Sequence, residues 1–275
     1  MVNTISLMTD FGYCDQYVGV MKSVIINHNP SVSLIDITHG IEPQNLSQAK
    51  FLTKCSYDYF PKKSVHIIVV DPDVGTDRNI LIAETPNAFF IAPDNGVLSE
   101  IVKPYVNKTP LGNESFVTPS DLCKLYVLDQ PQYWNDSVSN TFHGRDIFAP
   151  VGGLLAKNRD PKIFGTHVKQ MIYDPIVSPI LSIECIEGEI VYVDRFGNLI
   201  SNIESTQIDY TKDLTIGVEG IVIDKLGDTF KQPNVHGDLV ALIGSHGYLE
   251  VALYQANASN ETNIGEGSKI TVQYR

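Results

Sequence analysis

The 275-residue sequence predicts an α/β N-terminal domain with a mainly parallel sheet flanked by helices, followed by a smaller all-β, barrel-like C-terminal domain. Three observations support this prediction. Apolar strand-like runs alternate with helical patterns in the first half, as expected for βαβ units. A stretch with two prolines interrupts the chain near residue 175. Only short, closely spaced strand-like runs follow it, which is typical of a small barrel or sandwich.

The N-terminal half opens with an alternation of strands and helices. The first helix is indicated by Val18, Met21 and Ile25, which share one helical face, and Asn29-Pro30 ends it. The expected elements are, in order, a strand over 4–8, a helix over 17–26, a strand over 32–37, a helix over 45–59 and a strand over 66–70. The third strand ends in Asp71-Pro72, and such a stiff turn places a carboxylate at the carboxyl edge of the sheet, where open α/β folds bind ligands.

The rest of this half adds a hairpin and further mixed elements. They are strands over 80–84 and 88–92, a short helix opening over 97–102, a strand over 122–128 and a helix over 144–156. The prolines then place a linker at 173–182 between an N-terminal domain, 1–172, and a C-terminal domain, 183–275. Strands of the C-terminal domain are expected over 187–194, 199–203, 214–218, 220–223, 239–243, 248–253 and 269–272.

Composition excludes several classes of protein. Hydrophobic residues make up 43% and charged residues 19% of the chain, which is a globular composition. The net charge of −12 and the lack of a basic patch argue against nucleic acid or an anionic membrane as a partner. No signal peptide or membrane-spanning run is recognisable, and the four cysteines form no C-x-x-C pair. We therefore expect a cytoplasmic protein without a structural zinc site or a disulfide scaffold.

Polar clusters gather at strand ends and sharp turns. They are Thr9–Gly12 with Asp15, Asp71–Arg78, Pro93–Gly96, Phe142–Asp146, Asp194–Asn198 and Gly244–Tyr248. Each cluster taken alone is more often a structural turn, and Asp71 with Arg78 could be a plain surface ion pair. Together, the N-terminal clusters follow strands whose ends share one sheet edge, which favours a common site.

Among the histidines, only His143 is expected to act, because it directly precedes a helix that can orient one ring nitrogen. No role is assigned to His28, His39, His66, His167 or His236. Asp10, Asp71, Asp94 and His143 could instead bind a metal ion, but no metal-ligand spacing appears and two nearby arginines oppose a cation. No nucleophile elbow or glycine-rich phosphate loop is present either.

Seven spaced motifs, which include these six clusters, resemble one family. They are Thr9–Gly12, Asp36–His39, Val70–Arg78, Ala92–Gly96, Thr141–Pro150, Asp194–Asn198, and Gly244-Ser245 with Gly247–Glu250. In order and spacing they are similar to the S-adenosyl-L-methionine hydrolases that form adenosine, also called S-adenosyl-L-methionine hydroxide adenosyltransferases, which are related to fluorinase and chlorinase.

The resemblance implies attack of water or hydroxide at ribose C5′, giving adenosine and L-methionine, with no cofactor. It places a water-activating triad on Asp71, Arg78 and His143, and the residues leave open whether Asp71 or His143 is the base. It also implies substrate-binding roles, which fall on Asp10 for the ribose hydroxyls, Gln44 near C5′, Asp15, Asp194 and Ser245 for the methionine group, Phe196 and Asn198 for adenine, and Tyr248 in the last motif.

The resemblance further implies a homotrimer with sites between subunits. A halogenase is disfavoured by Asp71, because the halogenating relatives have a tyrosine at that position. A non-catalytic S-adenosylmethionine or adenosine binding protein stays open, because Asp73 stands where the family usually has glycine. If that position required a positive φ, aspartate would be strained there by about 1 kcal/mol.

Overall fold

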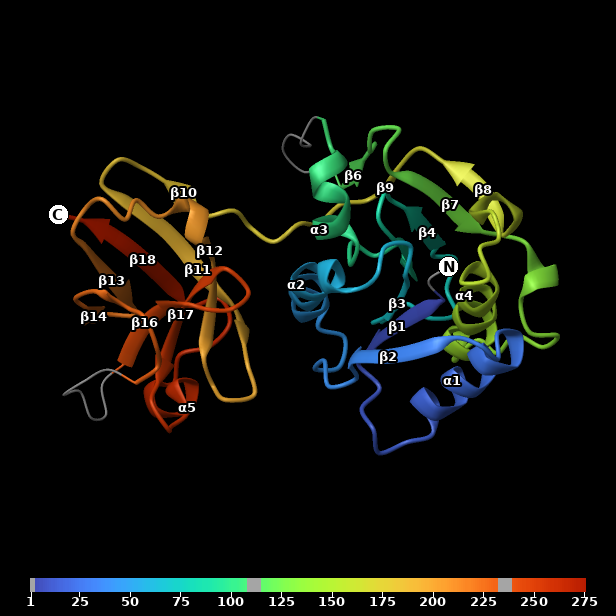
Figure 1. Cartoon of the computed structure of the whole chain (residues 1–275), viewed down its shortest axis with the longest axis horizontal. Helices are drawn as coiled ribbons and strands as arrows, with labels where there is room; N and C mark the ends of the chain where they lie inside the picture. Colours follow the sequence, from blue (N-terminus) through green and yellow to red (C-terminus); the bar gives the residue numbers. More distant parts are fainter. Residues whose placement is uncertain (1–2, 108–114, 232–238) are drawn as a thin grey trace. The chain divides into compact units, whose positions relative to one another are not determined.

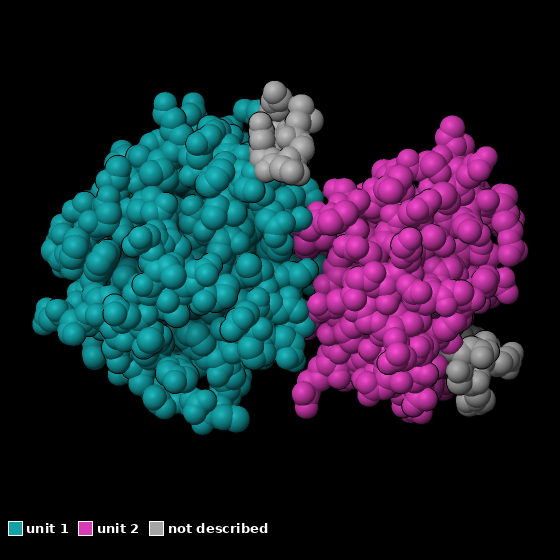
Figure 2. Space-filling view, turned by 180° about the vertical axis from the view of Figure 1, so that it is seen from behind, with its two compact units in different colours: residues 1–175 teal, residues 176–275 magenta. Residues whose placement is uncertain are grey.

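The computed structural model describes residues 3–107, 115–231 and 239–275, so His236 lies outside the described residues. The chain divides into two compact units, Met1–Pro175 and Ile176–Arg275, which Figure 2 shows in different colours. We call them unit 1 and unit 2. The division lies inside the stretch expected to be the linker.

Unit 1 is a layered α/β structure. Its elements are β1 (Thr4–Thr9), α1 (Tyr17–His28), β2 (Ser33–Thr38), α2 (Leu46–Ser56), β3 (Val65–Val69), β4 (Ile80–Glu84), β5 (Phe89–Pro93), α3 (Ser99–Val102), β6 (Phe116–Val117), β7 (Lys124–Leu128), α4 (Ala149–Leu155), β8 (Gly165–Val168) and β9 (Met171–Ile172). A π-helical turn over Gly144–Phe148 leads directly into α4. Helix α2 begins with a side-chain cap, in which Asn45 accepts a hydrogen bond from the Gln48 amide.

The main sheet of unit 1 has the strand order β2-β1-β3-β5-β4-β7-β8. The pairs β2–β1, β1–β3 and β3–β5 are parallel, whereas the pairs β5–β4, β4–β7 and β7–β8 are antiparallel. The expectation of a mainly parallel sheet is therefore wrong, and the sheet is mixed. The reason is the predicted hairpin: it inserts β4 between β5 and β7, and all later pairings in the sheet run against their neighbours.

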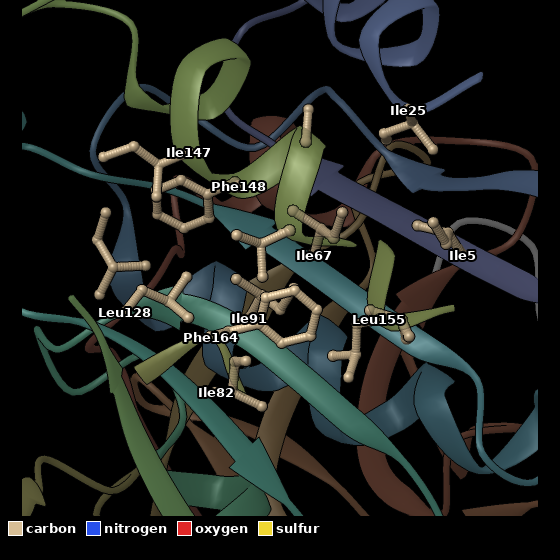
Figure 3. Packing of buried hydrophobic residues seen from close by; sticks show 14 of the residues in the cluster. Ile5, Ile25, Ile67, Ile82, Ile91, Leu128, Ile147, Phe148, Leu155 and Phe164 are labelled. Carbon is tan, nitrogen blue, oxygen red and sulfur yellow. The ribbon is translucent and has the colours of Figure 1, made fainter. Parts of the chain in front are cut away.

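Both faces of this sheet are covered. Ile67 and Val69 of β3 pack in the apolar layer that includes α1 and α4, while Ile68 and the following Val70 pack in the layer that includes α2 and α3. Figure 1 shows these helices on the two sides of the sheet. Figure 3 shows the first of these layers, in which Ile67 and Ile91 lie close to Phe148 from the turn before α4. Because successive strand residues face opposite sides, β3 is buried on both faces and its carboxyl end is held firmly.

Unit 2 is built on one curled sheet. Its elements are β10 (Ile180–Leu181), β11 (Cys185–Val193), β12 (Leu199–Glu204), β13 (Leu214–Val218), β14 (Ile221–Ile223), β15 (Leu226–Gly227), β16 (Leu239–Ile243), β17 (Tyr248–Leu253), α5 (Ala258–Thr262) and β18 (Lys269–Tyr274). The strands follow the order β14-β13-β18-β11-β12-β17-β16-β15, with β10 added beside β11, and β14 approaches β16. The sheet is therefore nearly closed and barrel-like around its own apolar core.

Across the described ranges, no helix combines the length and the apolar character that crossing a membrane requires.

Candidate active site

Asp71, Arg78 and His143 lie in direct contact, although 65 residues separate the last two in sequence. Arg78 Nε donates to Asp71 Oδ1 at 2.5 Å, and Arg78 Nη2 bonds Asp71 Oδ2 in a two-pronged ion pair. The same Nη2 lies 3.1 Å from His143 Nδ1. The side chains of Asp71 and Arg78 are only 4% and 7% exposed, so this is a buried constellation and not a surface ion pair.

The contact with Arg78 fixes the protonation of His143. A guanidinium N–H can only donate, so Nδ1 of His143 must accept, and the ring proton of the neutral imidazole then sits on Nε2. Burial lowers the pKa of His143 and the Arg78 charge lowers it further, against opposing effects of Asp71 and Asp146. His143 is therefore neutral near pH 7, with an N–H available on the side away from Arg78.

A tight turn returns the chain from Asp71 to Arg78. The Asp71 carbonyl accepts from the Val74 amide at 3.3 Å, and the Asp73 carbonyl accepts from the Thr76 amide at 3.1 Å. Gly75 has φ +83° and packs so closely on the next segment that a Cβ would lie 2.1 Å from the carbonyl oxygen of Asn140. The positive φ of this turn falls on Gly75 and not on Asp73, so the strain considered for Asp73 does not arise.

Asp146 anchors the segment that carries His143. Its buried carboxylate accepts hydrogen bonds from the Ser139 amide at 2.8 Å, from Arg145 Nε at 2.6 Å and from Asn135 Nδ2 at 3.2 Å. Burial alone would raise the pKa of Asp146, but these hydrogen bonds lower it. Asp146 was assigned no role from the sequence, although it lies in the Phe142–Asp146 motif, which could have indicated that it supports His143.

Asp10 follows β1 and is hydrogen-bonded to the loop before α2. The amide of Gln44 donates to Asp10 Oδ2 at 2.8 Å, and Gln44 adopts φ +67° to do so. The structure thus joins these two predicted residues through the Gln44 main chain. Asp15, also expected at the substrate, lies in an exposed stretch before α1.

An aromatic cluster connects the Asp10 loop to the His143 segment. The ring of Phe142 packs edge-on against Phe11 at 5.9 Å and against Tyr17 at 5.1 Å between centroids. Thr9 and Val69 are direct neighbours on β1 and β3, so Asp10 and Asp71 leave adjacent strand ends. The predicted residues of unit 1, apart from Asp15, therefore gather at one edge of its sheet.

In unit 2, Asp194, Phe196 and Asn198 share one rigid turn between β11 and β12. Asp194 Oδ1 accepts from the amides of Phe196 and Asn198 at 2.9 Å each, and Oδ2 accepts from Asn198 Nδ2 at 2.9 Å. The turn presents the ring of Phe196, which is 76% exposed. Asp194 therefore stabilises the turn through its own hydrogen bonds, independently of any ligand.

Ser245 and Tyr248 belong to the turn between β16 and β17. The Gly244 amide bonds the Tyr248 carbonyl at 2.9 Å, and Tyr248 Oη donates to Glu204 at 3.3 Å. His246 Nε2 lies 2.9 Å from the buried Glu250 carboxylate and braces the same turn.

The residues considered for a metal site are dispersed. Asp94 accepts from the Ile172 amide at 2.8 Å, and burial raises its pKa although this bond and one from Asn79 oppose the shift. Within the described residues, no group of three or more His, Cys, Asp or Glu side chains is arranged to hold a metal ion.

The fold and site define a two-domain protein with an acid–guanidinium–imidazole cluster at the edge of a mixed sheet. The family model for the SAM hydroxide adenosyltransferase N-terminal domain matches residues 5–165, and that for the C-terminal domain matches residues 188–271. The chain belongs to the SAM hydroxide adenosyltransferase family.

Individual relatives are similar along their whole length. The (R)-S-adenosyl-L-methionine hydrolase of Methanocaldococcus jannaschii is 30% identical, with 100% of this chain and 97% of the relative covered. A fluorinase of Nocardia brasiliensis is 22% identical, over 98% of this chain and 96% of the relative. The crystal structure of an uncharacterized conserved protein from Thermotoga maritima matches with a TM-score of 0.86 and 30% identity, covering 98% of this chain and 99% of that one.

Proposed function

We propose that this protein is an enzyme that hydrolyses S-adenosyl-L-methionine to adenosine and L-methionine. Full-length relatives at 26–30% identity bear the name (R)-S-adenosyl-L-methionine hydrolase. The observation that carries the proposal is the contact of one guanidinium, Arg78, with both Asp71 and His143. This arrangement suits the activation of one water molecule in a partly dry environment.

In this reaction the protein needs to activate only the nucleophile. The water oxygen forms a bond to C5′ while the C5′–S bond breaks, and the electron pair of that bond stays on sulfur. The leaving group is a neutral thioether, so it needs no general acid, and the proposed step requires no cofactor. Opposite charges neutralise in the transition state when an anionic nucleophile attacks a sulfonium, which a water-poor site favours.

The hydrogen bonds support Asp71 as the base. Because Arg78 occupies Nδ1 of His143, the neutral ring can offer only its Nε2 proton, which would orient the water by donating to its oxygen. The Asp71 carboxylate, held by Arg78, can then accept the water proton. General-base assistance of this kind is worth roughly 10²–10⁴-fold.

The substrate contacts follow the resemblance. We assign Asp10 to the ribose hydroxyls, Gln44 to the region near C5′, and Phe196 with Asn198 to adenine. Asp15, Asp194 and Ser245 are assigned to the methionine group, with Tyr248 beside them. The exposed ring of Phe196 on a braced turn supports a stacking role.

We also propose a homotrimer with sites between subunits, acting in the cytoplasm. All four cysteines are free thiols, which agrees with a reducing compartment. Sedimentation of the purified protein would test the trimer, and a monomer at micromolar concentration would contradict it.

The function is tested by incubating the purified protein with S-adenosylmethionine, with and without chloride, and identifying the nucleoside by chromatography. Adenosine and methionine in equal amounts are expected under both conditions. Binding without product would indicate a binding protein instead, and a 5′-chlorinated nucleoside that appears only with chloride would indicate a halogenase.

A further inference from the structure

His39 is a buried histidine at the end of β2 that reaches the end of β1. It is 1% exposed, and its Nδ1 lies 2.8 Å from the hydroxyl of Thr9, which is fully buried. The register between the two strands shifts near this point: Leu7 pairs with Asp36, but Met8 pairs with Thr38. β2 therefore has one residue more than β1 at this point, which changes the direction of the side chains that follow it.

Thr9 and His39 bond the loop that follows Asp10. The Phe11 amide donates to the Thr9 hydroxyl at 3.2 Å, and the Gly12 amide donates to the His39 carbonyl at 2.8 Å. The Thr9 hydroxyl therefore bonds both the Phe11 amide and His39 Nδ1. The main chain that follows Asp10 is thus held by hydrogen bonds to Thr9 and His39.

Two further groups lie against the His39 ring. Nε2 lies 3.2 Å from Asp36 Oδ1, although the two atoms are not aligned for a hydrogen bond, and the other oxygen of Asp36 binds Lys22 Nζ at 2.6 Å. The ring of Tyr13, which follows Gly12, packs edge-on against His39 at 5.1 Å. The imidazole is therefore bonded to β1 through Thr9 and packed by Asp36 of β2 and by Tyr13 of the Asp10 loop.

We propose that Thr9 and His39 are positioning residues that hold the Asp10 carboxylate in the geometry for binding the two ribose hydroxyls. The inference rests on the proposed function, because Asp10 takes its ribose role from it. The Asp10 carboxylate itself accepts from the Gln44 amide, and the main chain that follows Asp10 is held by Thr9 and His39. A ribose diol requires two acceptor oxygens at defined positions, and a loop free to rotate would lose that geometry.

A second buried histidine gives a matched control. His66 on β3 is equally buried, and its Nδ1 lies 2.6 Å from the hydroxyl of Ser6, also on β1. Its ring stacks on Phe90 at 4.9 Å, in the middle of the sheet. The pair Ser6–His66 therefore has the same chemistry as Thr9–His39 but holds no loop amide that the structure shows.

The test compares Thr9→Val with Ser6→Ala, each of which removes one hydroxyl bonded to a buried histidine. Thr9→Val is expected to raise KM for S-adenosylmethionine about tenfold with little change in kcat, since a lost hydrogen bond to a positioned group costs that much. Ser6→Ala should lower the unfolding temperature but leave KM unchanged. Thr9→Ser, which keeps the hydroxyl, should restore KM.

Calorimetric binding of nucleosides separates positioning from a general loss of structure. Thr9→Val should weaken adenosine binding about tenfold but leave the already weak binding of 2′,3′-dideoxyadenosine unchanged, because that analogue has no diol. His39→Asn keeps a polar group near the Nδ1 position, so its affinity for adenosine should lie between those of the wild type and of His39→Leu. If Thr9→Val does not fold, the two His39 variants test the positioning role in its place.

The outcomes distinguish this inference from the proposed function. Wild-type protein that binds adenosine but releases none from S-adenosylmethionine contradicts the hydrolase and leaves the binding comparison to decide the positioning role. Equal KM and equal adenosine affinity in Thr9→Val and Ser6→Ala would overturn the positioning role alone. Equal losses for adenosine and the dideoxy analogue would also overturn it, and a wild type that binds neither nucleoside overturns both.

Discussion

At the scale of single residues, the two acids of the turn after β3 should behave differently. Asp71 is buried against Arg78, whereas Asp73, two residues away, is exposed. Asp71→Asn removes the proposed base and should lower kcat roughly 10²–10⁴-fold while S-adenosylmethionine still binds. Asp73→Asn is the control and should change kcat by no more than about twofold. Steady-state kinetics with calorimetric binding check both, and full activity of Asp71→Asn would refute the assignment.

The protonation of His143 predicts the acid limb of the pH–rate profile. Only the neutral ring can accept from Arg78, and its pKa lies below the ordinary value of 6.5 because of burial and the Arg78 charge. The midpoint of the acid limb should therefore lie below pH 6.5. The profile of kcat/KM measures this directly. A midpoint at or above 6.5 would contradict the proposed hydrogen-bond pattern.

The proximity of site residues was predictable from sequence where a family motif follows a strand end. Asp71, Arg78 and His143 were predicted together, and the structure brings them into contact. The main-chain contact of Gln44 could not be predicted, because it depends on a left-handed backbone conformation at a residue other than glycine. His39 was given no role, since its contact with Thr9 depends on the strand register and on the shift in that register after Leu7.

At the scale of secondary structure elements, the turn between β3 and β4 depends on Gly75. Gly75→Ala adds both a left-handed strain and a Cβ that would lie 2.1 Å from the Asn140 carbonyl oxygen. We expect a loss of about 2–4 kcal/mol in the free energy of unfolding and a fall in kcat, because Asp71 and His143 are pushed apart.

Gly220 provides the control for this substitution. It has φ +84°, and no atom lies within 4 Å of the position a Cβ would take. Gly220→Ala should therefore cost only the strain of about 1–2 kcal/mol and leave kcat unchanged. Denaturant unfolding and kinetics of both variants make the comparison, and equal effects on kcat would show that the Asn140 contact does not matter.

A histidine on β3, His66, should make the free energy of unfolding depend on pH. Burial lowers the pKa of His66 to about 4, whereas an unfolded histidine titrates near 6.5. Between these values the unfolded chain binds a proton that the folded chain does not, so stability is complete above pH 6.5 and is lost progressively down to about pH 4. The loss amounts to roughly 3 kcal/mol.

Denaturant unfolding between pH 4 and 8 would measure this dependence. His66→Asn does not titrate in this range and should give a flatter curve than the wild type. An unchanged slope in the variant would mean that other groups cause the acid sensitivity.

The elements themselves were largely predictable, but their pairing was not. The seven strands expected in the second half lie within one or two residues of the observed bounds, because alternation and turn residues are local signals. The two-residue strands β10 and β15 were not predicted. The position of β4 between β5 and β7 is set by contacts across distant segments. The local sequence pattern therefore predicted the hairpin correctly, but it did not predict that the sheet has both parallel and antiparallel pairs.

At the scale of the whole molecule, the two units have separate cores. Residues 177, 178 and 180–184 between them are exposed. Brief subtilisin treatment should therefore cut first near residues 175–184 and leave two fragments that keep their secondary structure. Mass spectrometry and circular dichroism of the separated fragments would check this. Early cleavage inside β3 or β11 would contradict independent cores.

Because β3 is buried on both faces, it should tolerate substitutions much better than insertions or deletions. Deleting or inserting one residue in this strand would send every later side chain to the opposite face, so both apolar layers and the orientation of Asp71 would be lost in a single event. Exchanges among valine, isoleucine and leucine disturb only one layer by a methylene or less. Natural variants of this enzyme should therefore differ freely in the identity of these aliphatic residues and almost never in the length of the strand.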